Sequence, residues 1–207
     1  MNEFKLIIGD KHASSWSLRA WLMLKQCIVD FDEQIIRLGQ SDTKQKILQV
    51  SLAGKVPVLK HQDIIIWESL AIGEYLSELY PQVNLWPEDR NARAVARAVS
   101  NEMHAGFTNL RSKMPFDLLN KHQFPEDDEL VSEIKRVEQI WEACRTNYGQ
   151  AGKFLFGNFG IADAMYAPVV LRFDTYGYLS SNCVVRKYCS AVIEHSNVQY
   201  WLEQARK

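Results

Sequence analysis

The chain has 207 residues, 47% of them hydrophobic and 24% charged, with a formal net charge of −1 at pH 7. This length fits one large or two small domains with a substantial core. Because Lys and Arg form no run, neither nucleic acid nor an anionic membrane surface is expected as a partner. No apolar stretch reaches the about 18 residues that a membrane helix needs, and the start lacks a secretory pattern, so a cytoplasmic location is expected.

The cysteines and histidines show no metal-site pattern. The four cysteines contain no CxxC pair, and the five histidines are scattered without ligand spacing. In the absence of a secretory signal, cysteines of this kind are expected to be free thiols in a reducing cytoplasm. We therefore expect neither a disulfide framework nor a metal centre.

The first half of the chain alternates short apolar runs with helical patterns. In chain order, the patterns predict a strand at 4–8, a helix at 15–27, a strand at 31–38, an irregular stretch at 39–54, a hairpin of strands at 56–60 and 64–67, and a helix at 68–79. A βαβ crossover places its two strands parallel. The order β-α-β followed by β-β-α is that of a thioredoxin-like domain.

The second half contains only helical patterns. They predict helices at 89–110, 126–148, 161–173, 184–195 and 199–206. The composition changes at 81–87, which indicates a linker. We therefore predict an α/β plus all-α fold: a thioredoxin-like domain at 1–80, a linker at 81–87 and an all-helical domain at 88–207.

Two serines come shortly after the first predicted strand, at the end of the loop 9–14, and open the first helix, in the run SSWSLR at 14–19. In thioredoxin this position holds a CxxC dithiol, and hydroxyl groups cannot form a disulfide. A hydroxyl can instead donate a hydrogen bond to a bound thiolate. A free thiol has a pKa of about 8.5, and both a helix N-terminus and such a donor lower that value. Ser14 and Ser15 are therefore the candidate activating groups.

Two further motifs lie in the predicted hairpin and at the start of the next helix. The run GKVPVL at 54–59 places a Pro at the beginning of a strand, and WESLAI at 67–72 places an acidic residue and a serine between a strand and a helix. A helix N-terminus with a serine suits a carboxylate, and a glutamate suits an ammonium group. Ser69 and Glu68 are the residues concerned.

These motifs and the run FGNFGIAD at 156–163 occur in the order found in cytosolic glutathione transferases. The chain resembles that family from Ser14 to Asp163, and its serine motif resembles the zeta-class pattern SSxSxR. The resemblance implies that glutathione is the co-substrate and that a serine stabilises its thiolate. The zeta pattern favours Ser14, whereas the theta and delta pattern favours Ser15. Trp16 stands where the zeta class has Cys, which disfavours maleylacetoacetate isomerisation.

The resemblance also assigns roles in binding. It implies a cis bond between Val56 and Pro57, which presents the Val56 backbone to the cysteinyl part of glutathione. It places the γ-glutamyl ammonium at Glu68 and the γ-glutamyl carboxylate at Ser69. Three residues are candidates for the glycyl carboxylate: Lys44, Gln45 and Lys55. For the second-substrate pocket the candidates are Trp16, together with Phe107 and Arg111 on one face of the long helix at 89–110.

The remaining expectations concern local structure. Gly160 stands where the family has Ser or Thr, so Asp163 is expected to supply only its own half of a helix cap by bonding back to the Gly160 N–H region. Arg19 is expected to form structural ion pairs.

The leading hypothesis is a glutathione transferase acting on a small hydrophobic electrophile and pairing as a homodimer. The alternatives are a glutathione-dependent cis-trans isomerase of the maleylacetoacetate type and a non-catalytic glutathione-binding protein of the same fold.

Overall fold

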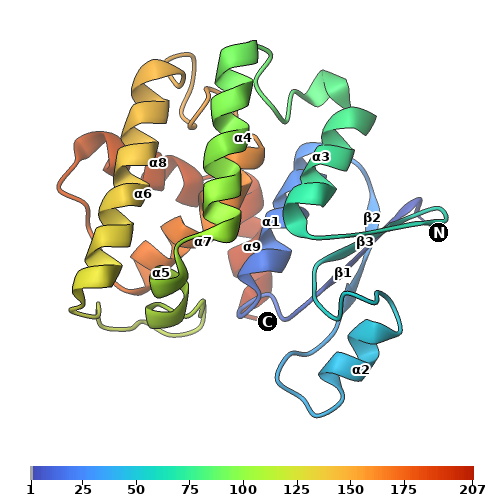
Figure 1. Ribbon diagram of the computed structural model, residues 1–207. Helices are drawn as coiled ribbons and strands as arrows, with labels where there is room; N and C mark the ends of the chain where they lie inside the picture. The colour runs from blue at the N-terminus through green and yellow to red at the C-terminus, as the bar shows by residue number, and fades with distance from the viewer. Residues whose placement is uncertain (1) are drawn as a thin grey trace.

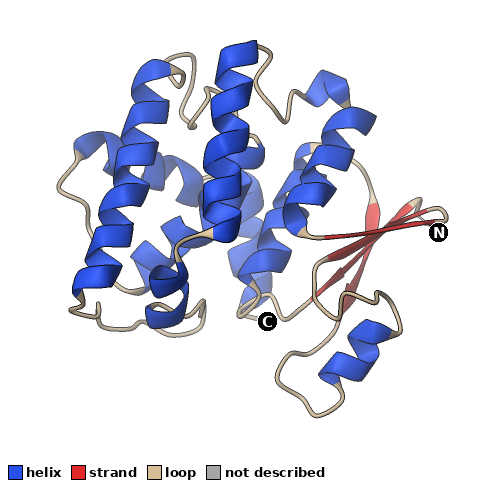
Figure 2. Ribbon diagram, viewed as in Figure 1, coloured by secondary structure: helices blue, strands red, loops and turns tan. Residues whose placement is uncertain are grey.

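The computed structural model describes residues 2–207, and its first part is a four-stranded mixed sheet with helices on both faces (Figure 1). The elements are β1 (Phe4–Ile8), α1 (Ser15–Gln26), β2 (Phe31–Ile35), α2 (Thr43–Leu48), β3 (Val58–His61), β4 (Ile64–Trp67) and α3 (Ser69–Leu79). The strand order is β2-β1-β3-β4, with β1 parallel to β2 and the other two pairs antiparallel. Figure 2 shows the sheet at one side of the molecule, with most of the helices on the other side. The predicted thioredoxin-like order is confirmed.

Alternation along β1 explains why both faces of the sheet are covered. Successive strand residues point to opposite faces. Leu6 and Ile8 belong to the large core that contains α1 and α3, whereas Ile7 belongs to a smaller cluster that contains Ile47 of α2. The stretch predicted to be irregular thus contains a helix. Its six residues bury only Ile47, a pattern too short to show helical periodicity.

The second part is helical, as predicted. Its elements are the 3₁₀ turn η1 (Pro81–Val83), α4 (Arg90–Ala105), α5 (Thr108–Lys113), α6 (Asp128–Asn147), α7 (Ile161–Thr175), α8 (Cys183–Ile193) and α9 (Ser196–Ala205). Helix α7 is buried along almost its whole length and packs against α1, α4 and α8. A helix that is apolar on nearly all sides belongs in the interior, and α7 is accordingly the central buried helix of this part. None of the helices in the described chain is both long and apolar enough to cross a membrane.

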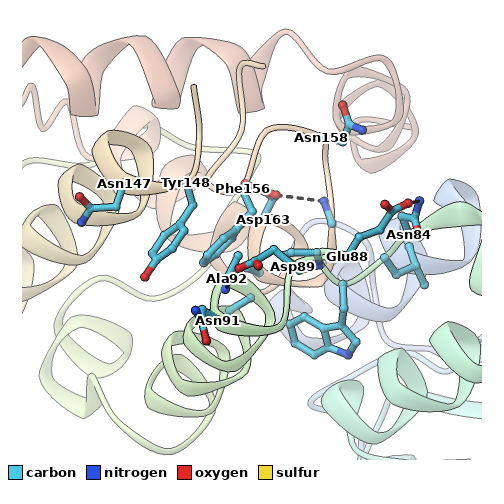
Figure 3. A pocket seen from close by; sticks show the side chains of 16 residues that line it. Asn84, Glu88, Asp89, Asn91, Ala92, Asn147, Tyr148, Phe156, Asn158 and Asp163 are labelled. Carbon is cyan, nitrogen blue, oxygen red and sulfur yellow. Dashed lines mark hydrogen bonds between the residues drawn. The ribbon is translucent and has the colours of Figure 1, made fainter. Parts of the chain in front are cut away.

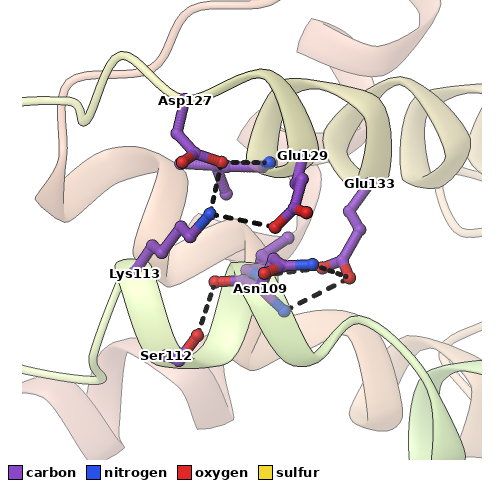
Figure 4. Close-up of polar contacts among 8 residues, drawn as sticks. Asn109, Ser112, Lys113, Asp127, Glu129 and Glu133 are labelled. Carbon is purple, nitrogen blue, oxygen red and sulfur yellow. Dashed lines mark hydrogen bonds and ion pairs between the residues drawn. The ribbon is translucent and has the colours of Figure 1, made fainter.

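The expected long helix at 89–110 is wrong in one respect, because it breaks into α4 and α5 at Gly106. Phe107 then adopts a left-handed conformation with φ 57° and precedes α5. The carboxylate of Glu133 on α6 accepts the backbone N–H groups of Asn109 and Leu110 at 3.2 and 2.7 Å. Figure 4 shows this contact beside the ion pairs of Lys113. The cap of α5 therefore comes from a distant helix, which local sequence patterns do not reveal.

Gly160 is explained by the close approach of Leu85, in the segment between α3 and α4, to the start of α7. A Cβ atom at this position would lie 2.6 Å from the carbonyl oxygen of Leu85, and that oxygen accepts the N–H of Ile161 at 2.9 Å. The carboxylate of Asp163 accepts the N–H groups of Gly160 and Leu155, each at 3.0 Å. The expected return bond from Asp163 is confirmed, and the missing side chain leaves room for the linker.

Candidate functional site

The first turn of α1 holds three buried serines, of which Ser14 and Ser17 are hydrogen-bonded to each other. Ser14 is the N-cap, and its Oγ accepts the backbone N–H of Ser17 at 3.3 Å. The Oγ atoms of Ser14 and Ser17 are 2.7 Å apart, and either hydroxyl can be the donor. The Ser17 Oγ also accepts the N–H of Gly9 at 3.0 Å. Ser17 thus connects the end of β1 to the start of α1, a role that the sequence motif contained but did not reveal.

Ser14 and Ser15 differ in what holds them. Ser14 is tied to Ser17, whereas Ser15 occupies the first helical position, and both are almost fully buried. Both lie where the unpaired N–H groups of the helix start collect, an environment that favours negative charge. The geometry is compatible with either serine as a donor to an anion.

A cavity of about 260 Å³ lies beside this turn. Its walls come from α1, the loop before β3, the turn between β4 and α3, and α4. The lining residues are Trp16, Ala53, Lys55, Val56, Pro57, Trp67, Glu68, Ser69 and His104. The Val56–Pro57 peptide bond is cis, as the sequence resemblance implied. Segments far apart in sequence thus bring together most of the residues expected to bind the tripeptide.

Glu68 and Ser69 occupy the turn that joins β4 to α3. Glu68 has φ 67°, a conformation that a residue with a side chain rarely adopts, and its carboxylate is about half exposed. Ser69 begins α3 and is fully buried, and its Oγ donates to the Met165 sulfur at 3.9 Å. Sulfur is a weak acceptor, so this hydroxyl gives up little by turning to another partner.

Six of the expected site residues do not line this cavity. Ser14 and Ser15 lie directly before Trp16, the residue of α1 that does line it. Lys44 and Gln45 are exposed on α2, and Phe107 is buried in the core at the break between α4 and α5. Arg111 is half-buried, with its guanidinium 5.6 Å from the Trp16 ring centre and its Nη1 donating to the His104 carbonyl oxygen at 3.2 Å. Arg111 therefore borders the cavity behind Trp16.

Arg19 packs on the Trp16 ring and corrects one expectation. Its guanidinium carbon lies 4.1 Å from the Trp16 ring centre, and its Nε donates to the Met165 carbonyl oxygen at 3.0 Å. Within residues 2–207 it forms no ion pair, so the expected ion pairs are wrong. Complete burial, with Arg172 and Arg111 nearby, lowers the pKa of Arg19 to about 9, which leaves it protonated at neutral pH.

His104 is a cavity residue that the sequence analysis did not select. It lies in the last turn of α4, with its ring in edge contact with Trp16 at 5.2 Å between centres. Its Nε2 is 3.4 Å from Oε2 of Glu68. Burial lowers the pKa of His104, the Glu68 carboxylate opposes this, and the positive groups of Arg19, Arg111 and Lys55 lower it further. The helix break at Gly106, which ends α4 beside the cavity, was the missing information.

A second cavity, of about 750 Å³, lies between the linker, the start of α4, the end of α6 and the loop before α7 (Figure 3). It is larger, but no residue of α1 lines it, whereas Trp16, next to Ser15, lines the smaller cavity. The Asp163 carboxylate in its wall is already bonded to backbone N–H groups. No group of three His, Cys, Asp or Glu residues suited to a metal ion was found over 2–207. The smaller cavity is therefore the candidate site.

Comparisons with known proteins agree on one family. The family model described as "Glutathione S-transferase, N-terminal domain" matches residues 13–79. The "Probable maleylacetoacetate isomerase" of Caenorhabditis elegans is 37% identical over 161 residues, covering 77% of this chain and 74% of that protein. "Glutathione S-transferase 1" of Dianthus caryophyllus is 29% identical and covers 76% and 71%. The crystal structure of a Burkholderia glutathione transferase homologue with bound glutathione superposes with a TM-score of 0.70 at 25% identity, covering 100% and 99%.

Proposed function

The chain belongs to the glutathione S-transferase family, and we propose that it binds glutathione in the cavity between α1 and α3 and activates the thiol for attack on a small hydrophobic electrophile. The observation that carries this proposal is the position of the α1 serines beside a cavity lined by Val56, Glu68 and Ser69. Holding thiol and electrophile together then supplies much of the rate.

Activation of the thiol is assigned to Ser14 or Ser15. When the Ser17 hydroxyl donates to Ser14 Oγ, the proton of Ser14 is left to donate to a thiolate. Ser15 lies one residue further into the same turn, and its hydroxyl is the alternative donor to the thiolate. The start of α1 adds its own positive end, so both arrangements lower the pKa of the bound thiol.

Capture of the tripeptide is assigned to the cavity walls. The backbone of Val56, next to the cis Pro57, pairs with the cysteinyl part as a short added strand. Glu68 receives the γ-glutamyl ammonium, and Ser69 at the start of α3 receives the γ-glutamyl carboxylate. Lys55 is the best supported partner for the glycyl carboxylate because it lines the cavity, whereas Lys44 and Gln45 lie outside it.

The electrophile site is assigned to the space beside Trp16, with Phe107 and Arg111 as further wall residues once an electrophile is bound. Arg111 borders the cavity behind Trp16, whereas Phe107 is buried.

Glutathione-dependent isomerisation is the second candidate, because a specific feature favours it. Arg19, Arg111 and Arg172 act on one another electrostatically and form no ion pair among the described residues, and Arg111 borders the cavity. Such positive charge suits an acidic second substrate, as maleylacetoacetate is, and the Caenorhabditis relative carries that name. Trp16 in place of a smaller residue argues against it. Release of unchanged glutathione together with a shifted double bond would identify an isomerase.

A homodimer is the proposed assembly, formed through what we call the β4 patch: Leu48, Leu52, Ile65 and Trp67. All four side chains are exposed, Leu52 to 93%, and they line an open hollow on the edge of the sheet. An exposed apolar edge strand is a surface that proteins normally cover. We further propose a cytoplasmic location, in keeping with four free cysteines, and a division into domains at 1–80 and 88–207 joined by 81–87.

The test replaces each serine separately. Ser14→Ala and Ser15→Ala are compared with Ser181→Ala, an exposed serine outside the site, for conjugation of glutathione to an activated aryl chloride. Replacing the serine that donates to the sulfur should lower kcat by about tenfold or more, because the pKa of the bound thiol then rises by about one unit. Ultraviolet titration of bound glutathione should show the same rise in pKa.

Unchanged conjugation in both variants would remove the serine assignment. A bound thiol in the wild-type protein with an undepressed pKa would instead favour the non-catalytic alternative.

A further inference from the structure

His104 is joined to the glutathione cavity by a continuous set of contacts from three helices. The Arg19 guanidinium covers a face of Trp16, the Trp16 ring meets the edge of His104, and the His104 Nε2 faces the Glu68 carboxylate at 3.4 Å. Arg111 fixes the last turn of α4 by donating to the His104 carbonyl oxygen. The imidazole is therefore held by its packing on Trp16 and by the fixed last turn of α4. Its one polar contact in the cavity is with Glu68.

The tautomer of His104 follows from its surroundings. The Nδ1 atom is buried without a hydrogen-bond partner among residues 2–207, whereas Nε2 faces a carboxylate. A neutral imidazole has one N–H and one bare nitrogen. A buried N–H with no acceptor is costly, so the proton belongs on Nε2, the ring nitrogen that lies 3.4 Å from Glu68 Oε2.

The charged groups around the ring favour its neutral form. Among residues 2–207, Glu68 at the start of α3 is the one carboxylate that acts on it, and Arg19 from α1, Arg111 from α5 and Lys55 from the loop before β3 oppose a further positive charge. A neutral donor holds a carboxylate in place without cancelling its charge. The negative charge of Glu68 then remains available to an incoming ammonium group.

We propose that His104, reaching across from α4, positions the Glu68 carboxylate for the γ-glutamyl ammonium of glutathione, so that residues of both halves of the chain recognise this amino group. This inference rests on the proposed function. Glu68 is about half exposed and stands in a strained turn conformation, so its side chain has little other support. His104 is thus a positioning residue, with no contact to the reacting sulfur.

A pH dependence follows from this arrangement. As the pH falls through the lowered pKa of His104, the ring becomes a cation and pairs with Glu68 in competition with the substrate ammonium. The KM for glutathione should therefore rise on the acid side in the wild type. The fall in kcat on the acid side, which protonation of the bound thiolate causes, should not depend on His104.

The experiment compares glutathione with its des-amino analogue, glutaryl-cysteinyl-glycine, which lacks only the ammonium. Binding is measured by quenching of tryptophan fluorescence, since Trp16 and Trp67 line the cavity. The wild-type protein should prefer glutathione by about tenfold, the value of one charge-assisted hydrogen bond. His104→Ala should reduce this preference to about threefold or less and leave the affinity for the analogue unchanged.

Two further variants separate positioning from packing. His104→Gln retains a donor but cannot titrate, so it should keep the preference at neutral pH and lose the acid-side rise in KM. His122→Gln, a partly exposed histidine on the loop before α6, should behave as the wild type in both assays.

Three results would overturn the inference. Equal loss of affinity for both ligands in His104→Ala would reduce His104 to a packing role. Two results would show that Glu68 is positioned without His104. One is an undiminished preference for glutathione over the analogue in His104→Ala, and the other is an acid-side rise in KM that persists in His104→Gln. Each of these leaves glutathione binding by the wild type intact, whereas a wild-type protein that fails to bind glutathione would overturn the proposed function as well.

Discussion

At the scale of single residues, Ser17 has the best defined structural role in the site. Its hydroxyl accepts the N–H of Gly9 at the end of β1 and shares a hydrogen bond with Ser14. The sequence motif predicted an activating hydroxyl at the start of the helix, and hydroxyls do gather there. It favoured Ser14 or Ser15 according to the class pattern, but it did not single out Ser17, whose role depends on a contact with Gly9, eight residues away in the chain.

Replacing Ser17 should therefore weaken the fold. Ser17→Ala leaves the buried N–H of Gly9 without its acceptor, and we expect a loss of about 1–3 kcal/mol in the free energy of unfolding. Urea unfolding is the measurement, with Ser181→Ala as the control expected within about 0.5 kcal/mol of wild type. A Ser17 variant as stable as the control would mean that Gly9 finds another acceptor.

At the scale of elements, the strands and long helices followed from apolar periodicity, and the errors lie where distant contacts decide. The break between α4 and α5 depends on the carboxylate of Glu133, more than twenty residues further along the chain. The short α2 is stabilised by packing of Ile47 under the sheet. His104 lay on the expected long helix but was not selected as a site residue, since a helix drawn through Gly106 gives no sign that its last turn meets Glu68.

Ile28, just after the end of α1, has a backbone conformation that is strained for a residue with a side chain. Ile28 has φ 56° and is 93% exposed, so burial of its side chain does not offset the strain of the left-handed conformation. Ile28→Gly removes steric strain of about 1–2 kcal/mol and adds a smaller entropy to the unfolded chain. We expect a net gain of about 0.5–1 kcal/mol and a higher Tm in calorimetry.

Ile28→Ala is the matched comparison, because alanine keeps the Cβ atom that the left-handed conformation disfavours. A glycine variant no more stable than the alanine variant would show that strain at Ile28 is negligible.

At the scale of the whole molecule, the β4 patch and the candidate site share a wall. Trp67 and Ala53 border both the cavity and the hollow of the patch. A partner seated on the patch would therefore support the outer side of the glutathione site. The sequence resemblance predicted pairing of this kind, but it could not say which apolar side chains remain exposed after folding.

Leu52→Glu tests the assembly. A carboxylate in the middle of an apolar contact costs several kcal/mol unless it is paired, so sedimentation velocity should show monomers at micromolar concentration. Leu179→Glu, at an exposed leucine of the helical part, should leave the sedimentation coefficient unchanged. A Leu52 variant that sediments like this control would place the contact elsewhere.

The last helix lies against the first loop of the chain. The indole of Trp201 in α9 donates to the carbonyl oxygen of Lys11 at 3.0 Å and packs on Trp21 of α1 at 5.3 Å between ring centres. A nonsense mutation that removes α9 would leave every proposed binding residue encoded, yet it would uncover the helix whose first turn holds the serines. Such an allele is expected to behave genetically as a null, although it encodes a complete glutathione-binding motif.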